Sequence, residues 1–377
     1  MKKKENSQKG KRIVLGIVAA LLALVLVVMV AGTVLADTIL GNMNFVEKGQ
    51  DESLSYEEAL ALKEQEMMAA TAETEAATQE GTEEPTEEST EEPTEESTDV
   101  VLSEDEIDLD VEILEAIGEG KEITNILLIG QDSQKGKRER SDSMMLVTVN
   151  TKKNTIIITS FMRDMYVKIP GYYKEKMNAA YMLGGMDLLN QTLYENFGVV
   201  VDHNVEVSFG QFREIIDYLG GIDMELTAKE AAFVNDAVNA GVIFMYEGMN
   251  HMDGLRTLAY ARYRDKGTGD FGRTERQRKT MNALIEKYKN SDLTTMIGMV
   301  NELMGMITTN MTKTEVLGYA VRFFPMLASA EIVSQRVPFD GKHTNGKEYY
   351  YMAKINEISV VVPRLEENVE RLAESLS

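Results

Sequence analysis

The sequence predicts a single α/β domain built around a mixed sheet with flanking helices, and three observations support this fold class. Short apolar, β-rich runs at Asn125–Gly130, Ser143–Val149 and Thr155–Ser160 are typical of buried strands. Segments with helical spacing follow, beginning at Met186–Asn196. Strands and helices then interleave along the rest of the chain, which is the pattern of a sheet covered by helices.

The individual elements follow from local signals. The polar turn Thr151–Asn154 joins the second and third strands into a hairpin. Gly220-Gly221 ends the amphipathic helix predicted over Phe209–Leu219. Pro363 is expected in the first turn of a final helix, where the backbone N–H that proline lacks would have no acceptor within the helix. The remaining predicted elements are strands at Val199–Val207 and Ile222–Leu226 and helices at Phe209–Leu219, Leu255–Ala261, Arg273–Lys289, Leu293–Met306, Thr314–Phe323 and Pro363–Leu376.

Residues 1–36 predict a membrane anchor. Residues 1–12 form a basic tail, and Ile13 to Ala36 contains no charged side chain. A helix of that length spans the roughly 30 Å core of a bilayer. The positive-inside rule then places the tail in the cytoplasm and everything after Ala36 outside. The alternative is a signal peptide cleaved after Val34-Leu35-Ala36, but its apolar region would usually be shorter.

Residues 37–118 predict a disordered acidic stalk. They carry 27 acids and two lysines, against a net charge of -23 for the whole chain, and include Thr-Glu-Glu-Pro and Thr-Glu-Glu-Ser repeats. Such a segment buries too little apolar surface to fold. It serves as a spacer, or it is an insertion without function. Residues 119–377 are then nearly neutral, which does not favour nucleic acid as a partner.

The chemistry-bearing residue types exclude several classes of enzyme. The chain has no Cys, so disulfides, thiolate zinc sites and a Cys nucleophile are excluded. The histidines His203, His251 and His343 share no ligand spacing, and no G-x-S-x-G or H-E-x-x-H motif is present. No phosphate-binding loop of the G-x-x-x-x-G-K-[ST] type occurs either, so ATP is not the expected donor.

Acidic and basic side chains follow three of the predicted strands. Asp132 comes after the first, Arg140 and Asp142 before the second, and Arg163-Asp164 after the third. Loops at the strand ends of α/β folds are common places for active sites. Carboxylates without His or Cys make an all-oxygen site suited to Mg²⁺ or Mn²⁺. The alternative is that each aspartate caps a turn or pairs with a nearby arginine.

Arginines are concentrated between residues 259 and 278, interrupted by glycines. A helix beginning near Gly272 would place Arg273, Arg276 and Gln277 on one face. The guanidinium fork binds phosphate oxygens in pairs, and the alternative is a solvated face with ordinary salt bridges. The cluster consists of Arg262, Arg264, Arg273, Arg276 and Arg278. Together with a divalent cation, such a cluster indicates phosphoryl transfer.

These stretches resemble the LytR–CpsA–Psr (LCP) family of bacterial cell-envelope enzymes. The similarity covers most of residues 124–290 and includes NILLIGQD, RSDSMMLVTVN, SFMRDMYVKIPG, KMNAAYMLGG, FREIIDYLGGIDMEL, LAYARYR and DFGRTERQR. It implies an LCP-like fold and an extracytoplasmic catalytic domain over residues 119–377. It also implies transfer of a teichoic acid-like or capsule-like glycopolymer from polyprenyl pyrophosphate to peptidoglycan through a phosphodiester.

The resemblance also implies roles for particular residues. Asp132 and Asp142 would hold Mg²⁺, and Asp142 or Asp164 would activate the acceptor hydroxyl. The residues implied to bind the pyrophosphate are Arg140, Arg163, Arg262, Arg264, Arg273, Arg276 and Gln277. The chain departs from the family pattern at Gln134, where Arg is common, and at Met162, where Pro is common.

Two other functions remain open. A lipid-pyrophosphate hydrolase would use the same site with water as acceptor. A non-catalytic envelope protein that binds the lipid or the wall would keep the arginines without needing the carboxylates Asp132, Asp142 and Asp164.

Overall fold

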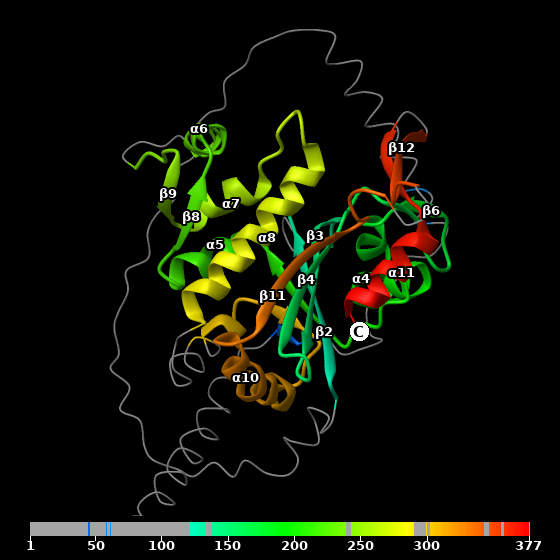
Figure 1. Ribbon diagram of the computed structural model, residues 1–377, viewed down its shortest axis with the longest axis horizontal. Helices are drawn as coiled ribbons and strands as arrows, with labels where there is room; N and C mark the ends of the chain where they lie inside the picture. Colours follow the sequence, from blue (N-terminus) through cyan, green and yellow to red (C-terminus); the bar gives the residue numbers. More distant parts are fainter. Residues whose placement is uncertain are drawn as a thin grey trace, which may run out of the picture. The chain divides into compact units, whose positions relative to one another are not determined.

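The computed structural model describes residues 44–45, 58, 61, 121–132, 138–238, 243–289, 299, 302–342, 347–355 and 358–376 (Figure 1). The predicted basic tail and membrane helix lie outside the described residues, as does nearly all of the predicted stalk. Within the described part of the chain, no helix is both long and apolar enough to cross a membrane. Asn44–Phe45, inside the predicted stalk, forms the short strand β1, which pairs with Thr308–Thr309.

A seven-stranded mixed sheet forms the centre of the described residues and confirms the predicted fold class. Its order is β1-β10-β7-β2-β3-β4-β11. Adjacent strands are antiparallel in β2–β3–β4, whereas β7 runs parallel to β2 and β11 parallel to β4. The strands are β2 (Ile123–Gln131), β3 (Ser141–Asn150), β4 (Thr155–Phe161), β7 (His203–Ser208), β10 (Thr308–Thr309) and β11 (Glu331–Val337).

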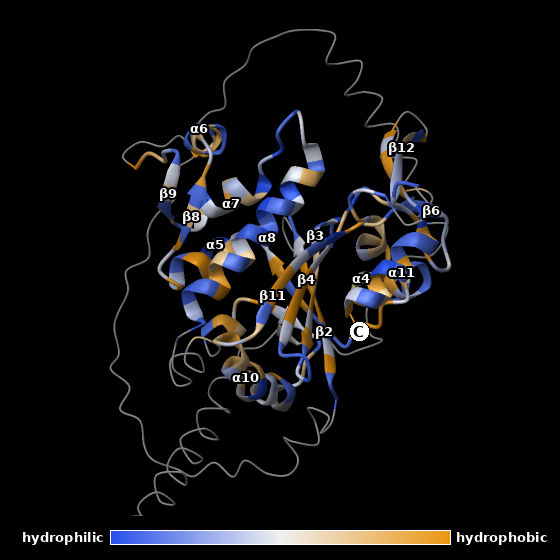
Figure 2. Cartoon of the chain, in the orientation of Figure 1, coloured by the Kyte–Doolittle hydropathy of each residue, from blue (hydrophilic) through white to orange (hydrophobic). Residues whose placement is uncertain are grey.

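Alternation along the strands gives the sheet two apolar faces. Leu127 pairs with Leu146, and both side chains are fully buried on the face that carries Asn204, which bonds to Asn190 of α4 (Ala179–Phe197). Val147, on the other face, packs in an apolar cluster with residues of α10 (Lys313–Leu327). Figure 2 shows this apolar colouring concentrated on the central strands.

Helices cover both faces, which gives three layers. Figure 1 shows α4 and α11 on one side of the sheet, and α5 and α8 on the other. The bounds of these helices are α5 (Phe209–Tyr218), α8 (Gly269–Tyr288) and α11 (Leu365–Leu376). A capping box at Ser208 starts α5 directly after β7, so the chain turns from strand to helix within one residue.

A smaller apolar cluster lies beside α5 and carries the arginine-rich segment. It is centred on Ile216, Val234, Met252 and Tyr260. Gly254 lets this cluster close, because a Cβ there would lie 2.2 Å from the backbone oxygen of Arg213 in α5. The elements around the cluster are β8 (Ile222–Leu226), α6 (Ala228–Ala237), β9 (Gly248–Met252) and α7 (Gly254–Arg262).

Some predicted boundaries are wrong. The strand predicted over Val199–Val207 begins only at His203. Pro363 ends a strand, and the last helix begins at Leu365. Most of the helix predicted over 293–306 lies outside the described residues. The strands that the sequence did not predict include two pairs outside the central sheet: β5 (Tyr166–Lys168) with β6 (Lys174–Lys176), and β12 (Tyr350–Ile355) with β13 (Ile358–Pro363).

Candidate active site

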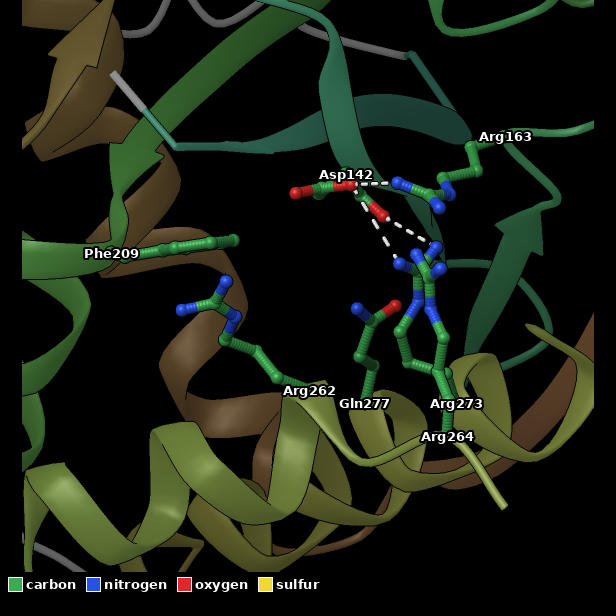
Figure 3. A pocket seen from close by; sticks show the side chains of 7 residues that line it. All are labelled: Asp142, Arg163, Phe209, Arg262, Arg264, Arg273 and Gln277. Carbon is green, nitrogen blue, oxygen red and sulfur yellow. Dashed lines mark hydrogen bonds and ion pairs between the residues drawn. The ribbon is translucent and has the colours of Figure 1, made fainter. Parts of the chain in front are cut away.

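A polar pocket opens where β3 and β4 meet the helices of the arginine-rich segment (Figure 3). Its volume is about 320 Å³. Its lining residues come from five elements and their adjoining loops, and they are Asp142, Arg163, Phe209, Arg262, Arg264, Arg273 and Gln277. Six of these seven had been singled out from the sequence; the exception is Phe209, the first residue of α5.

Asp142 is the carboxylate around which the pocket is organised. The register of β2 and β3 shifts between Gly130, opposite Ser143, and Gln131, opposite Ser141, so Asp142 lies at a β-bulge. A bulge bends the strand and redirects a side chain. The carboxylate of Asp142 forms an ion pair with Nη1 of Arg163, and its Oδ1 lies 3.6 Å from Nη1 of Arg273.

Asp270 is a second acidic residue of the site, and the sequence did not single it out. Its Oδ1 lies 2.5 Å from Nη2 of Arg273, 3.7 Å from Nε of Arg163 and 3.8 Å from Nε of Arg264. One buried carboxylate therefore holds three arginines that line the pocket. Burial raises the pKa of the Asp270 carboxyl, and the positive charge of Arg273 opposes this change.

Arg273 is the most constrained of the pocket arginines. Its side chain is 5% exposed, and its Nη2 donates to the backbone oxygen of Asp142 over 3.2 Å. Burial lowers the pKa of Arg273 to about 10; Asp270 opposes the change, while the neighbouring Arg163 and Arg264 add to it. A charged guanidinium in a buried, fixed position interacts strongly with an anion, because little water competes for it.

Arg262 and Arg264 form the open side of the pocket, and both side chains are about half exposed. The guanidinium of Arg262 lies 4.5 Å from the ring centroid of Phe209. Its Nη2 is 3.7 Å from Oδ2 of Asp132, at the end of β2. Arg262 thus connects the first predicted aspartate with the pocket.

Gln277 and Arg276 face different directions, so the predicted common face is wrong for Arg276. Gln277 accepts a hydrogen bond from Ser143 (3.2 Å) beside the pocket. Arg276 instead donates through Nε to Glu230 of α6 (2.9 Å), and its guanidinium lies 4.3 Å from the ring centroid of Tyr263. At about 100° per residue, positions i+3 and i+4 lie on opposite sides of Arg273.

Asp164 and Arg140 lie next to the pocket without lining it. Asp164 forms an ion pair with Lys176 at 2.9 Å. Burial raises the pKa of Asp164, but the hydrogen bond from Lys176 and the charges of Lys176, Arg163 and Arg273 outweigh it, so the pKa is lowered. Arg140 donates to Oδ1 of Asn178 (3.1 Å).

Comparison with known proteins shows what this fold and site belong to. The family model described as "LytR_cpsA_psr family" matches residues 71–366. The chain belongs to this family. Members of the family have been crystallised, and the B. subtilis TagT structure matches with a TM-score of 0.55 at 26% identity, over 68% of this chain and 91% of that one.

Other LytR_cpsA_psr members carry functional names. The "Polyisoprenyl-teichoic acid--peptidoglycan teichoic acid transferase TagU" of Bacillus cereus is 32% identical over 61% of this chain and 74% of the relative. TagU of Bacillus licheniformis is 31% identical, over 66% and 78%. A structure of TagT with bound octaprenyl pyrophosphate lipid matches with a TM-score of 0.53 at 25% identity, over 68% of this chain and 90% of that one.

The Mg²⁺ site predicted from the sequence would be formed by Asp132 and Asp142. Asp132 directly follows β2, and Asp142 is the second residue of the neighbouring β3, so both carboxylates lie at the same end of the sheet. The described residues contain no group of three His, Cys, Asp or Glu side chains fit to hold a metal. Mg²⁺ is commonly held by one or two carboxylates plus substrate phosphates and water, so this donor set fits it.

A polar cluster on the face of the sheet opposite the pocket surrounds Gln131 at the end of β2. Gln131 donates to Glu206 of β7 and accepts from the N–H of Glu139 (3.2 Å), so it connects Glu139 with the sheet. Tyr181 of α4 donates to the other oxygen of Glu206. Gln134, one of the departures from the family pattern, lies outside the described residues. Met162, the other departure, is fully buried.

Proposed function

We propose that this protein transfers a teichoic acid-like or capsule-like glycopolymer from polyprenyl pyrophosphate to peptidoglycan through a phosphodiester. The observation that carries the proposal is the convergence of Arg163, Arg262, Arg264 and Arg273 on one open pocket beside Asp142. Four permanent cations around a small polar cavity suit a pyrophosphate better than a neutral ligand. The printed names of the TagU and TagT relatives support the same donor and acceptor.

The pocket has a cationic end, which binds the pyrophosphate, and an apolar end. Arg163 and Arg273 bind phosphate oxygens at the buried end, and Arg262 and Arg264 close over them from the exposed side. Gln277 adds an amide beside them. Phe209 provides an apolar wall of the pocket for the first carbons of the prenyl chain.

The reaction forms one P–O bond and breaks another. The acceptor hydroxyl oxygen bonds to the phosphorus that carries the glycopolymer, the bond from this phosphorus to the oxygen of the polyprenyl phosphate breaks, and polyprenyl phosphate leaves. Asp142 lines the pocket, whereas Asp164 does not line it and is ion-paired with Lys176, so Asp142 is the better placed carboxylate to accept the hydroxyl proton.

Mg²⁺ (or Mn²⁺) at Asp132 and Asp142 would neutralise charge that develops on the pyrophosphate. The arginines contribute in the same direction, since they remain charged and are already positioned before the substrate binds. Asp270 keeps three of them in place.

The location of the protein follows from its proposed substrates. Residues 13–36 anchor it in the membrane, the basic tail remains in the cytoplasm, and residues 119–377 act on the outer side, where lipid-linked glycans and peptidoglycan meet. The acidic segment 37–118 separates the two. No nucleic-acid partner is proposed.

The test uses the full chain in detergent with a polyprenyl-pyrophosphate oligosaccharide and a peptidoglycan fragment. Mass spectrometry should detect the phosphodiester-linked product and free polyprenyl phosphate in equal amounts. Polyprenyl phosphate without the linked product would identify a hydrolase instead. Tight lipid binding without any turnover would identify a non-catalytic binding protein.

A further inference from the structure

A second arginine cluster lies on the face of α8 that packs against β11, away from Arg273 and Gln277. Asn282 of this face donates to Ser334 of β11 (3.1 Å). Arg336, two residues further along β11, places its guanidinium carbon 4.4 Å from the ring centroid of Phe271 at the start of α8. Arg278 lies between them on the same face, seven residues after Phe271.

The cluster has more positive charge than its neighbours neutralise. Arg336 is 8% exposed and forms an ion pair with Asp340, whose side chain is 74% exposed. Burial lowers the pKa of Arg278 to about 10, and the charge of Arg336 adds to this change. Glu275 is the other nearby carboxylate, and it pairs with Lys279 at 3.1 Å. Among the described residues, Nη1 of Arg278 and Nε of Arg336 have no hydrogen-bond partner.

Aromatic rings border the two arginines. The ring centroid of Tyr350 lies 5.1 Å from that of Phe271. Tyr351, next to it on β12, is 48% exposed, and the guanidinium of Arg364 lies 5.5 Å from its ring centroid. Aromatic faces beside guanidinium groups suit a sugar chain that bears a carboxylate, because the C–H face of a sugar stacks on a ring and the acid pairs with arginine.

This arginine–aromatic cluster adjoins the pocket. Phe271 directly follows Asp270, which holds three pocket arginines. Val337, which follows Arg336, pairs with Phe161 of β4 and accepts the N–H of Met162 (3.0 Å), next to Arg163. The cluster therefore borders the Arg163 side of the pocket. Figure 3 shows Phe209 on the opposite side of the pocket from Arg163.

We propose that the surface formed by Phe271, Arg278, Arg336 and Tyr350 binds the acceptor, a glycan strand that carries a carboxylate. The inference rests on the proposed function and assigns the acceptor to a particular surface. An attacking hydroxyl must approach phosphorus from the side opposite the leaving lipid phosphate. With the lipid on the Phe209 side, the acceptor must come from the Arg163 side. The exposed carboxylate of Asp340 marks where the acid of the ligand would contact Arg336.

The test compares Arg278→Gln with the control Lys229→Gln in the full chain. Lys229 is an exposed cation of α6, outside the cluster. Equilibrium binding is measured without donor, using a peptidoglycan fragment with free stem carboxylates and the same fragment with those carboxylates amidated. Binding of octaprenyl pyrophosphate is measured in parallel, and melting temperatures show whether each variant is folded.

We expect Arg278→Gln to weaken binding of the acidic fragment about ten- to a hundredfold, as for the loss of a hydrogen bond to a charged group. Binding of the amidated fragment and of octaprenyl pyrophosphate should not change, and Lys229→Gln should behave as the wild type. Equal loss for both fragments, no loss, or a loss confined to the lipid would overturn the proposal.

A second variant covers the case in which Arg278→Gln does not fold. Asp340→Asn changes an exposed side chain and removes the carboxylate that occupies Arg336. It should tighten binding of the acidic fragment alone; unchanged or weaker binding would contradict the inference. These binding measurements need no turnover. If the wild type binds the acidic fragment through Arg278 but forms no linked product, the proposed function fails while the carboxylate site stands.

Discussion

The Oδ1 atom of Asp270 lies 2.5 Å from Nη2 of Arg273, three residues further along α8. The same oxygen is within 4 Å of Nε of Arg163 and Nε of Arg264. These arginines come from the end of β4, the segment after α7 and the second turn of α8. Asp270 does not line the pocket, but it fixes the positions of three arginines that do. The carboxylate of Asp142, which lines the pocket, contacts two of the same arginines.

Asp270→Asn should reduce donor affinity more than it reduces stability. The amide keeps the shape of the side chain but removes the charge that holds the three arginines against their mutual repulsion. We expect octaprenyl pyrophosphate to bind at least about tenfold more weakly, a loss of roughly 1.4 kcal/mol. Calorimetric titration checks this, and a variant with unchanged affinity would show that the arginines are positioned without Asp270.

Asp164→Asn should make the free energy of unfolding less dependent on pH in the acidic range. The folded-state pKa of Asp164 is lowered, so its contribution is complete above the unfolded value near 3.8 and is lost as pH falls through the lower folded value. We expect the variant to lose about 1–3 kcal/mol at pH 7, because Lys176 loses a charged hydrogen-bond partner. Urea unfolding from pH 7 to pH 2 should show the two proteins converging at the acid end.

Arg276→Ala should destabilise the fold without removing a phosphate contact. Arg276 is paired with the buried carboxylate of Glu230, and leaving such a charge alone costs about 3–5 kcal/mol. Chemical unfolding measures the loss. At a temperature where the variant is folded, its lipid affinity should match the wild type, whereas Arg273→Ala should lower it. A reversed pattern would restore Arg276 to the pyrophosphate site.

Gly254→Ala should disturb the placement of Arg262. A Cβ at Gly254 would meet the backbone oxygen of Arg213 at 2.2 Å, which forces α7 away from α5 and costs about 1–3 kcal/mol. Gly267→Ala is the matched control, because the nearest atom to its Cβ is the Asp265 carboxylate at 3.9 Å. Melting temperature and transfer rate should fall in the first variant and remain near wild type in the second.

The sequence predicted the central strands well because their signals are local. Asn125–Gly130 and Thr155–Ser160 are apolar runs with clear ends, and both lie inside the observed β2 and β4. Glu331–Val337 lacks such a signal: Ser334 and Gln335 interrupt the run, and the strand exists because it pairs in register with β4. Pairing across more than 170 residues cannot be read from the local pattern.

The site was predicted in type but not in detail. The arginine-rich segment indicated an anion site, and three of its five arginines, Arg262, Arg264 and Arg273, line the pocket together with Arg163 from the end of β4. Which arginine turns inward depends on the partners around α8: Arg273 lies beside Asp142 and Asp270, whereas Glu230 draws Arg276 to α6. Asp270 and Phe209 were missed because their roles arise from side chains contributed by other segments.

The most direct test of the central claim compares product formation by the full-length wild type with that of the Asp142→Ala variant. The wild type, given polyprenyl-pyrophosphate oligosaccharide, peptidoglycan fragment and Mg²⁺, should yield the phosphodiester-linked product by mass spectrometry. Asp142→Ala should reduce the rate at least about a hundredfold with the protein still folded by its melting curve, and chelation of the metal should reduce wild-type turnover as well. Full activity of folded Asp142→Ala would contradict the account.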